Sequence, residues 1–145
     1  MKIRQSFEQA ICILLLIGAN EGSIKNNQLS EILGVSDSYL KKVTRQLVVA
    51  GLITSKASKI GGFVLKKDLE NISFLDIFEA IEGKEKFIET THLVDKVFDS
   101  TLRVKETEDV IINYLNSAEN QYKAKLKEIT LAHIIDAAHD RGEKI

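Results

Sequence analysis

Hydroxyl and basic side chains alternate with apolar ones between residues 36 and 47, at a spacing that suits a helix with one buried face. If Leu40, Val43 and Leu47 point into a core, the polar side chains of this segment face outward. The outward-facing residues are then Ser38, Tyr39, Lys41, Lys42 and Arg45. Groups of this kind bond to base edges and neutralise phosphates, so the segment predicts binding to a polyanion.

The charge pattern around this segment favours that interpretation. No acidic residue occurs from Ser38 to Lys67, whereas ordinary solvated helix faces mix both signs. For any one of the cations taken alone, a plain solvated face explains the residue equally well. A helix that enters the major groove does so by its N-terminal turns. We therefore expect Ser38, Tyr39 and Lys42 at base edges, and Ser36, Lys41 and Arg45 at phosphates.

A loop rich in lysine and glycine follows, from Lys56 to Gly62. Lys56 and Lys59 add positive charge, and Gly61 and Gly62 let the backbone approach a sugar-phosphate chain closely. The two glycines also suit an ordinary tight turn, so that explanation stays open.

The residues before this segment have the spacing of a helix-turn-helix, which would position the predicted recognition helix. Two helices that cross at a tight turn need apolar anchors, a small residue at the close approach and a turn residue that tolerates unusual dihedral angles. Gly34 suits the turn and Ser30 the close approach. The apolar anchors are Leu29, Leu33, Val35, Leu40 and Val43. A plain helical hairpin is the alternative, but it explains neither the place of Gly34 nor the local charge.

Caps and periodicity divide the rest of the chain. We expect helices at 6–19, with Ser6 as cap, and at 27–33, 37–50, 73–83, 108–128 and from Thr130 onward, and a hairpin of strands at 52–55 and 62–65. Residues 85–105 have weak periodicity and receive no assignment. The sequence predicts a mainly α (α+β) protein, a winged helix-turn-helix followed by a long C-terminal helix.

Two of these helices have more apolar surface than one chain can cover. The first is apolar nearly all round, and the long helix has an apolar seam about three heptads in length. We expect a second copy of the chain to cover both, which predicts a homodimer. The predicted dimer contacts are Ile11, Leu15, Ile111, Leu115, Ala118, Tyr122 and Leu126.

Charge divides the 145-residue chain near Asp68. Residues 1–68 have ten Lys/Arg and five Asp/Glu, a net charge of +5, and residues 69–145 have ten and sixteen, a net charge of −6. We therefore expect a DNA-binding domain at 1–68 and a helical region for dimerisation and signal sensing at 69–145. No stretch suits a membrane span or a signal peptide, so we expect a cytoplasmic protein.

Other chemistry has little support in the sequence. Cys12, the single cysteine, is flanked by isoleucines and is more simply a buried apolar residue than a redox sensor. His133, Asp136 and Asp140 share a helix face and could hold a metal, although an amphipathic helix explains them as well. No nucleophile has a neighbouring base and no glycine loop suits a phosphate cofactor, so we expect neither an enzyme nor a cofactor.

Four blocks in order resemble the Rrf-two (Rrf2) family of bacterial transcription regulators. They are YLKKV (39–43), AGLITS (50–55), IGGFVL (60–65) and ISFLDIFEAIEG (72–83), and ITLA (129–132) resembles the family's C-terminal segment. The resemblance implies a winged helix and a long helix that crosses its partner's. In the family the wing usually has an arginine and three glycines. Here Ala57 and Ile60 replace the arginine and the first glycine.

The resemblance also implies a sensor. In the sensor segment this sequence departs from the family members that bind an iron–sulfur cluster. Those members have three cysteines after the fourth helix, whereas residues 84–105 contain none and His92 is their only soft ligand. An iron–sulfur cluster needs thiolates, so we expect none. The sequence resembles the cluster-free branch, whose members respond to a partner protein, a small molecule or thiol oxidation.

Together these features predict a homodimeric repressor that binds double-stranded operator DNA. The alternatives are a winged-helix module that contacts proteins, or a thiol- or metal-responsive sensor with weak DNA affinity.

Overall fold

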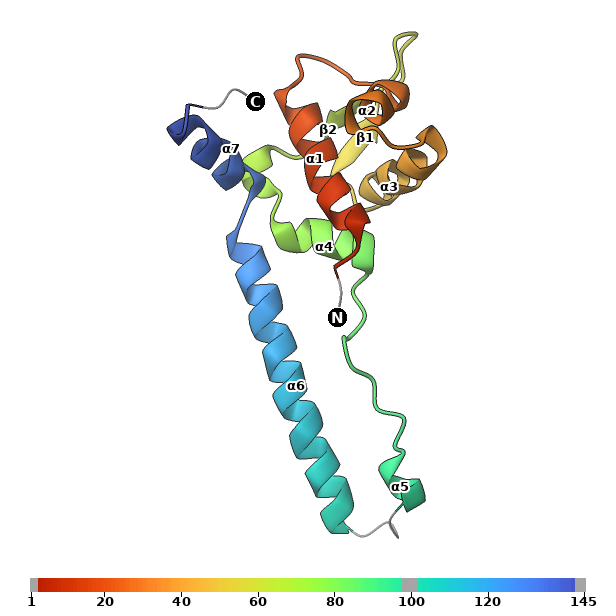
Figure 1. Ribbon diagram of the computed structural model, residues 1–145, viewed down its shortest axis with the longest axis vertical. Coiled ribbons are helices and arrows are strands. Elements are labelled where there is room, and N and C mark those ends of the chain that lie inside the picture. Colours follow the sequence, from red (N-terminus) through yellow and green to blue (C-terminus); the bar gives the residue numbers. More distant parts are fainter. Residues whose placement is uncertain (1–2, 98–101, 143–145) are drawn as a thin grey trace. The chain divides into compact units, whose positions relative to one another are not determined.

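The computed structural model describes residues 3–97 and 102–142 and separates into two compact units. The first unit comprises Met1–Gly83 and Leu126–Ile145, and the second comprises Lys84–Lys125. These bounds differ from the expected division at residue 68, because the helix at 74–82 packs on the N-terminal helices and the last helix packs on residues 69–71. Figure 1 labels the helices and strands of both units.

Helix α1 (Gln5–Ala19) supplies the centre of the first unit. Ala10, Ile13 and Leu14 are fully buried against α3, α4 and β2. Its other side, formed by Ile11, Cys12, Leu15 and Leu16, stays half-buried in the single chain. The expectation that Ser6 caps this helix was wrong, because the cap position lies two residues earlier, at Arg4, which makes no side-chain cap hydrogen bond.

The helix-turn-helix forms as predicted. Helix α2 (Asn26–Leu33) ends at Gly34, whose φ of 65° is the left-handed conformation that the turn requires. Helix α3 (Asp37–Val49) is capped by Ser36, whose hydroxyl accepts a hydrogen bond of 3.3 Å from the backbone N–H of Tyr39. Leu29, Leu40 and Val43 are buried between these helices and α1.

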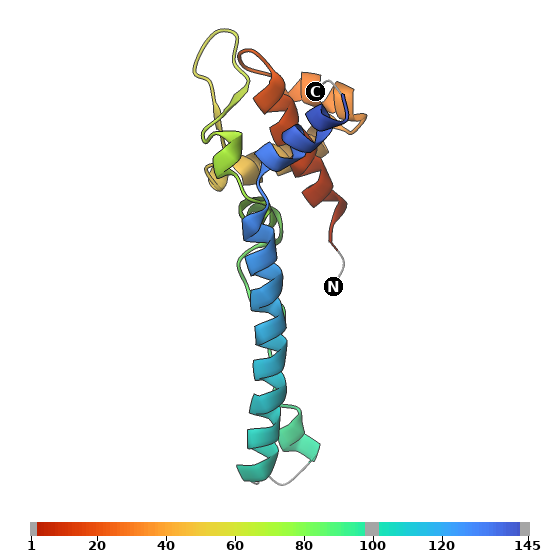
Figure 2. The same cartoon turned by 90° about the vertical axis from the view of Figure 1, so that its left-hand side faces the viewer.

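The wing is a short antiparallel hairpin. Strand β1 (Ile53–Ser55) pairs with β2 (Phe63–Leu65), with Thr54 opposite Val64, and the connecting loop projects beyond the strands (Figure 2). Phe63 also bridges to Ile24 ahead of α2. At Gly62, φ is +92° and a Cβ atom would lie 2.9 Å from the carbonyl oxygen of Ile24. Packing at the base of the wing therefore requires glycine at position 62.

The C-terminal helix is hydrogen-bonded into the first unit. A short 3-10 helix, η1 (Leu69–Asn71), leads into α4 (Phe74–Glu82), and α7 (Leu131–Asp140) follows later in the chain. The N–H of Leu131 donates to the carbonyl of Ile72 at 3.0 Å, and the N–H of Phe74 donates to the carbonyl of Ile129 at 2.8 Å. Ser73 caps α4 as predicted, because its hydroxyl accepts a hydrogen bond of 3.1 Å from the N–H of Asp76. Thr130 stands at the predicted cap position of α7, where its backbone N–H donates to the His133 ring and its side chain makes no cap hydrogen bond.

The second unit contains α5 (Val94–Val97) and most of α6 (Leu102–Glu128). Helix α6 begins at Leu102, well before the predicted start near residue 108. Residues 84–97 are attached to α6 through Phe87. Its N–H donates to the Glu119 carboxylate at 3.0 Å, its ring lies edge-on to Tyr122 with centroids 5.8 Å apart, and the Lys123 ammonium lies 5.2 Å from its centroid.

Candidate nucleic-acid interface

Helix α3 presents the predicted polar face to solvent. Ser38, Tyr39, Lys41, Lys42 and Arg45 are all exposed, and Leu40, Val43 and Leu47 on the other side are fully buried. One helix therefore brings the predicted base-edge and phosphate residues onto a single surface. Their contacts with DNA stay predictions.

The cations of this face differ in their surroundings. The Lys41 ammonium lies 2.8 Å from the Asp37 carboxylate, and hydrogen bonds from Lys41 and Asn26 lower the pKa of Asp37 below its usual value. Within residues 3–97 and 102–142, neither Lys42 nor Arg45 has a neighbouring carboxylate within ion-pair distance. A phosphate would have to compete with Asp37 for Lys41, but it could approach Lys42 and Arg45 without displacing an acid. Lys42 and Arg45 are therefore the stronger candidates.

A polar network that sequence reasoning missed fixes α3 against α2. The Asn26 amide donates to the Asp37 carboxylate at 2.5 Å, and the Thr44 hydroxyl lies 3.2 Å from the Asn26 amide oxygen. Thr44 is only 2% exposed, so its hydroxyl needs a partner inside the protein. A signal was present, since Thr44 is a polar residue on the buried face defined by Leu40 and Leu47.

The wing loop holds its two lysines in solvent. Lys56 and Lys59 are exposed, as is Ile60 between Lys59 and the glycines, with 70% of its surface accessible. The Ser23 hydroxyl donates to the carbonyl of Gly61 at 2.6 Å, which ties the loop to the segment before α2. Gly62 has a packing reason of its own, so its presence is no evidence for close contact with DNA.

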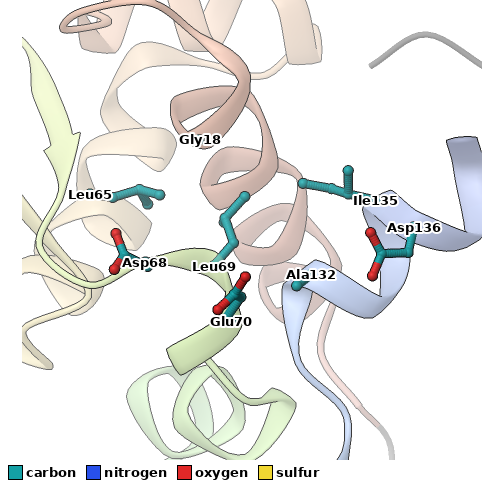
Figure 3. Close-up of a pocket in the computed structure, with 8 residues that line it drawn as sticks. All are labelled: Gly18, Leu65, Asp68, Leu69, Glu70, Ala132, Ile135 and Asp136. Atoms are coloured by element: carbon teal, nitrogen blue, oxygen red, sulfur yellow. The ribbon is translucent and has the colours of Figure 1, made fainter.

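A second surface of the first unit has the opposite charge. This surface contains a cavity of about 400 Å³. Figure 3 shows Asp68 and Glu70 from the η1 segment on one side of the cavity and Asp136 from α7 on the other. Leu69 and Ile135 lie between these carboxylates. Three acids would repel phosphates, so we do not expect DNA to bind at this face. Asp136 was considered as a metal ligand beside His133, but the His133 ring caps α7 through a 3.0 Å contact with the N–H of Thr130.

The predicted dimer contacts fall into two groups. On α6, Ile111 and Leu115 are 53% and 39% exposed, and Ala118 is exposed next to them. Val110 and Tyr114, which the sequence analysis did not single out, extend this apolar surface at 52% and 75% exposure. The second group is partly covered. Tyr122 contacts Phe87 of its own chain, and Leu126, Ile11 and Leu15 are half-buried.

The residues present do not fit an iron–sulfur cluster. Cys12, the only cysteine, is half-buried on α1, where burial raises the pKa of its thiol. His92 lies 3.2 Å from the Glu108 carboxylate and has no cysteine near it in the sequence. Among the described residues, no three His, Cys, Asp or Glu side chains are grouped to hold a metal ion.

Comparison with known proteins gives one consistent result. The model of the Rrf2 family, described as iron-dependent transcriptional regulators, matches residues 3–137. YwgB of Bacillus subtilis, named as an HTH-type transcriptional regulator, is 33% identical over 138 residues, which cover 94% of this chain and 85% of that protein. YffB of Lactococcus lactis, named likewise, is 34% identical over 94% of this chain and 88% of its own length.

Solved structures show the same fold. CymR, the global cysteine regulator of B. subtilis, superposes with a TM-score of 0.65 and 20% identity over 94% of this chain and 98% of its own. IscR of T. potens superposes with a TM-score of 0.69 and 22% identity over 100% of this chain and 93% of its own. The winged-helix fold is thus confirmed. No helix within the described ranges is both long enough and apolar enough to span a membrane.

Proposed function

Because the chain belongs to the Rrf2 family of DNA-binding transcriptional regulators, we propose that it is a homodimeric repressor that binds operator DNA without an iron–sulfur cluster. As a member of that family it is a transcriptional regulator and not an enzyme.

The exposed face of α3 is the observation that carries this proposal. Ser38, Tyr39, Lys42 and Arg45 share one solvent-facing surface, and the polar network under it holds the helix in place. Two such helices in a dimer would read a pseudo-palindrome whose half-sites lie about 34 Å apart, one turn of DNA. Lys56 and Lys59 on the wing would add phosphate contacts.

Pairing through α6 is supported by its uncovered apolar side chains. Val110, Ile111, Tyr114 and Leu115 follow one another along a single helix, and no part of the described chain covers them fully. Exposed apolar stripes of this kind usually mark an interface. The half-buried outer side of α1, with Ile11 and Leu15, would lie in the same dimer.

For the signal that releases the protein from DNA, we propose a kind of ligand or reaction. With one cysteine, the chain lacks the thiolates for a cluster, so release from DNA would follow binding of a small molecule or a protein, or oxidation of Cys12. Since its target is operator DNA, we also propose a cytoplasmic location.

Binding to DNA at two salt concentrations tests the proposal. The purified protein is titrated with its own upstream DNA and with a scrambled duplex of equal length, at roughly 50 and 200 mM salt. We expect selective binding that weakens steeply with salt, and weaker binding still for Arg45→Ala. Lys127→Ala, an exposed change on α6, is the control and should bind like the wild type. Weak binding that ignores sequence and salt would favour a protein-interaction module.

A further inference from the structure

A small cavity beside α3 is lined by polar side chains from three elements. Its volume is about 130 Å³, and its walls include Arg4 and Ser6 at the start of α1, and Tyr39, Lys42 and Gln46 along α3. Ile81 of α4 closes its apolar side together with Val43. The volume equals roughly four waters at ~30 Å³ each, so the cavity suits one small group and not a drug-sized ligand.

Hydrogen bonds and an ion pair to the end of α4 fix two of the side chains that line this cavity. The Gln46 amide donates to the carbonyl of Ile81 at 3.3 Å, which leaves its second N–H and its oxygen for other partners. Arg4 is fixed by Glu82 at the end of α4, with its Nε 3.1 Å from the carboxylate and its backbone N–H bonded to the same group at 3.2 Å. Four N–H donors of the guanidinium are then left, and the Arg4 side chain is 67% exposed.

The groups that reach solvent at this cavity are donors. Lys42 is exposed and no carboxylate within the described ranges pairs with it, the Ser6 and Tyr39 hydroxyls can both donate, and Arg4 adds its guanidinium. The carboxylates of the neighbouring residues have partners of their own, since Glu82 pairs with Arg4 and Asp37 pairs with Lys41 and Asn26. Glu8 lies two residues beyond Ser6, about 200° around α1, and so faces away from the cavity. A site with several donors and two cations favours an anion.

The cavity is continuous with the predicted DNA surface, because Tyr39 and Lys42 belong to both. We propose that it receives one phosphate of the DNA backbone at the edge of the groove entered by α3, with Arg4, Ser6 and Lys42 as its ligands. This inference rests on the proposed function and refines it. Lys42 becomes a phosphate ligand instead of a reader of base edges, and the start of α1 joins the DNA interface.

The two roles of Lys42 predict different binding data. Loss of a base contact relaxes the preference at one base pair, whereas loss of a phosphate contact weakens binding to every sequence alike. One phosphate contact changes the slope of log K against log salt by about 0.9, so between ~50 and ~200 mM salt its loss makes the salt effect roughly 3.5-fold smaller. We expect this reduction for Lys42→Ala and for Arg4→Gln, with base preference unchanged.

Ser6→Asp separates repulsion of phosphate from loss of folding. An acid in the first turn of a helix is favourable for the helix, so this variant should melt no lower than the wild type while it repels a phosphate. Gln121→Glu, an exposed change of equal charge on α6, is the matched control. We expect Ser6→Asp to bind operator DNA at least 3-fold more weakly than Gln121→Glu at ~50 mM salt.

A chemically modified duplex tests the phosphate itself. Neutral methylphosphonates are placed one at a time along the operator backbone, and each duplex is titrated with wild type, Ser6→Asp and Arg4→Gln. We expect one position in each half-site to weaken the wild type and to have little effect on either variant. If the wild type binds selectively but all three proteins respond alike at every position, the phosphate site is wrong and the proposed function stands. If the wild type shows no selective binding at all, the proposed function itself fails.

Discussion

Replacing Thr44 by valine tests whether the polar network under α3 stabilises the helix-turn-helix. Valine has the same shape as threonine, so the change removes the hydroxyl and leaves the packing of this fully buried side chain intact. The hydroxyl lies 3.2 Å from the carbonyls of Leu40 and Lys41 and from the amide oxygen of Asn26. Helix N–H groups already satisfy the two carbonyls, so the contact with Asn26 is the one lost without replacement.

The expected size of the effect follows from that single contact. A neutral hydrogen bond contributes about 1 kcal/mol to the free energy of unfolding. For a domain of this size, about 1 kcal/mol lowers the melting temperature by roughly 2–4 °C. Thermal unfolding followed by circular dichroism measures this shift. Thr54→Val, the same chemical change at an exposed position of β1, is the control and should melt within about 1 °C of the wild type.

A double-mutant cycle makes the test specific to the pair. If the hydroxyl acts through Asn26, Thr44→Val should cost almost nothing in an Asn26→Ala background, which gives a coupling of about 1 kcal/mol. The assignment of this network would be refuted if Thr44→Val lowered the free energy of unfolding equally in the wild type and in Asn26→Ala. Equal melting temperatures for Thr44→Val and Thr54→Val would also refute it.

Three further changes test other parts of the structure. Gly62→Ala should destabilise the protein by about 1–3 kcal/mol in a thermal melt, because φ is +92° and the added Cβ would also meet the Ile24 carbonyl. Gly22→Ala has the same kind of backbone strain, with φ at +104°, but no atom lies within 4 Å of its added Cβ, so it should cost less. Glu119→Gln should lose less stability than the wild type when the pH is lowered. The Lys123 ammonium and the N–H of Phe87 hold the pKa of Glu119 below its usual value, so the carboxylate stabilises the fold above a pH of about 4.5 and that contribution disappears as the pH falls through the lowered pKa. The free energy of unfolding of both proteins is measured by urea unfolding at several pH values. A difference between the two free energies that does not change with pH would contradict this prediction. Tyr114→Glu should dissociate the proposed dimer in analytical ultracentrifugation, and Asn113→Glu on the same helix should not.

Local signals made the helix-turn-helix and the caps predictable from sequence. Gly34, Ser36, Ser73 and Thr130 act within three or four residues of themselves, so their effects depend on neighbours that the sequence places beside them. The face of α3 was predictable for the same reason, since Leu40, Val43 and Leu47 fix its orientation by periodicity.

Contacts between distant residues were not predictable in this way. The bond between Arg4 and Glu82 joins residues 78 positions apart, and the attachment of Phe87 to Glu119 joins residues 32 apart. Neither pair has a local pattern that selects it over the other charged or aromatic residues of the chain. Residues 84–97 lack periodicity because single contacts at Phe87, Thr90 and His92, and not a buried helix face, bind this segment to α6.

A hydroxyl-radical footprint on the protein's own upstream DNA tests the central claim most directly. Two recognition helices related by a two-fold axis should protect two patches on one face of the duplex, with centres about 34 Å apart, and Arg45→Ala should weaken both patches equally. A single patch, patches on opposite faces, or protection that Arg45→Ala leaves intact would contradict the proposal that a dimer reads its operator through α3.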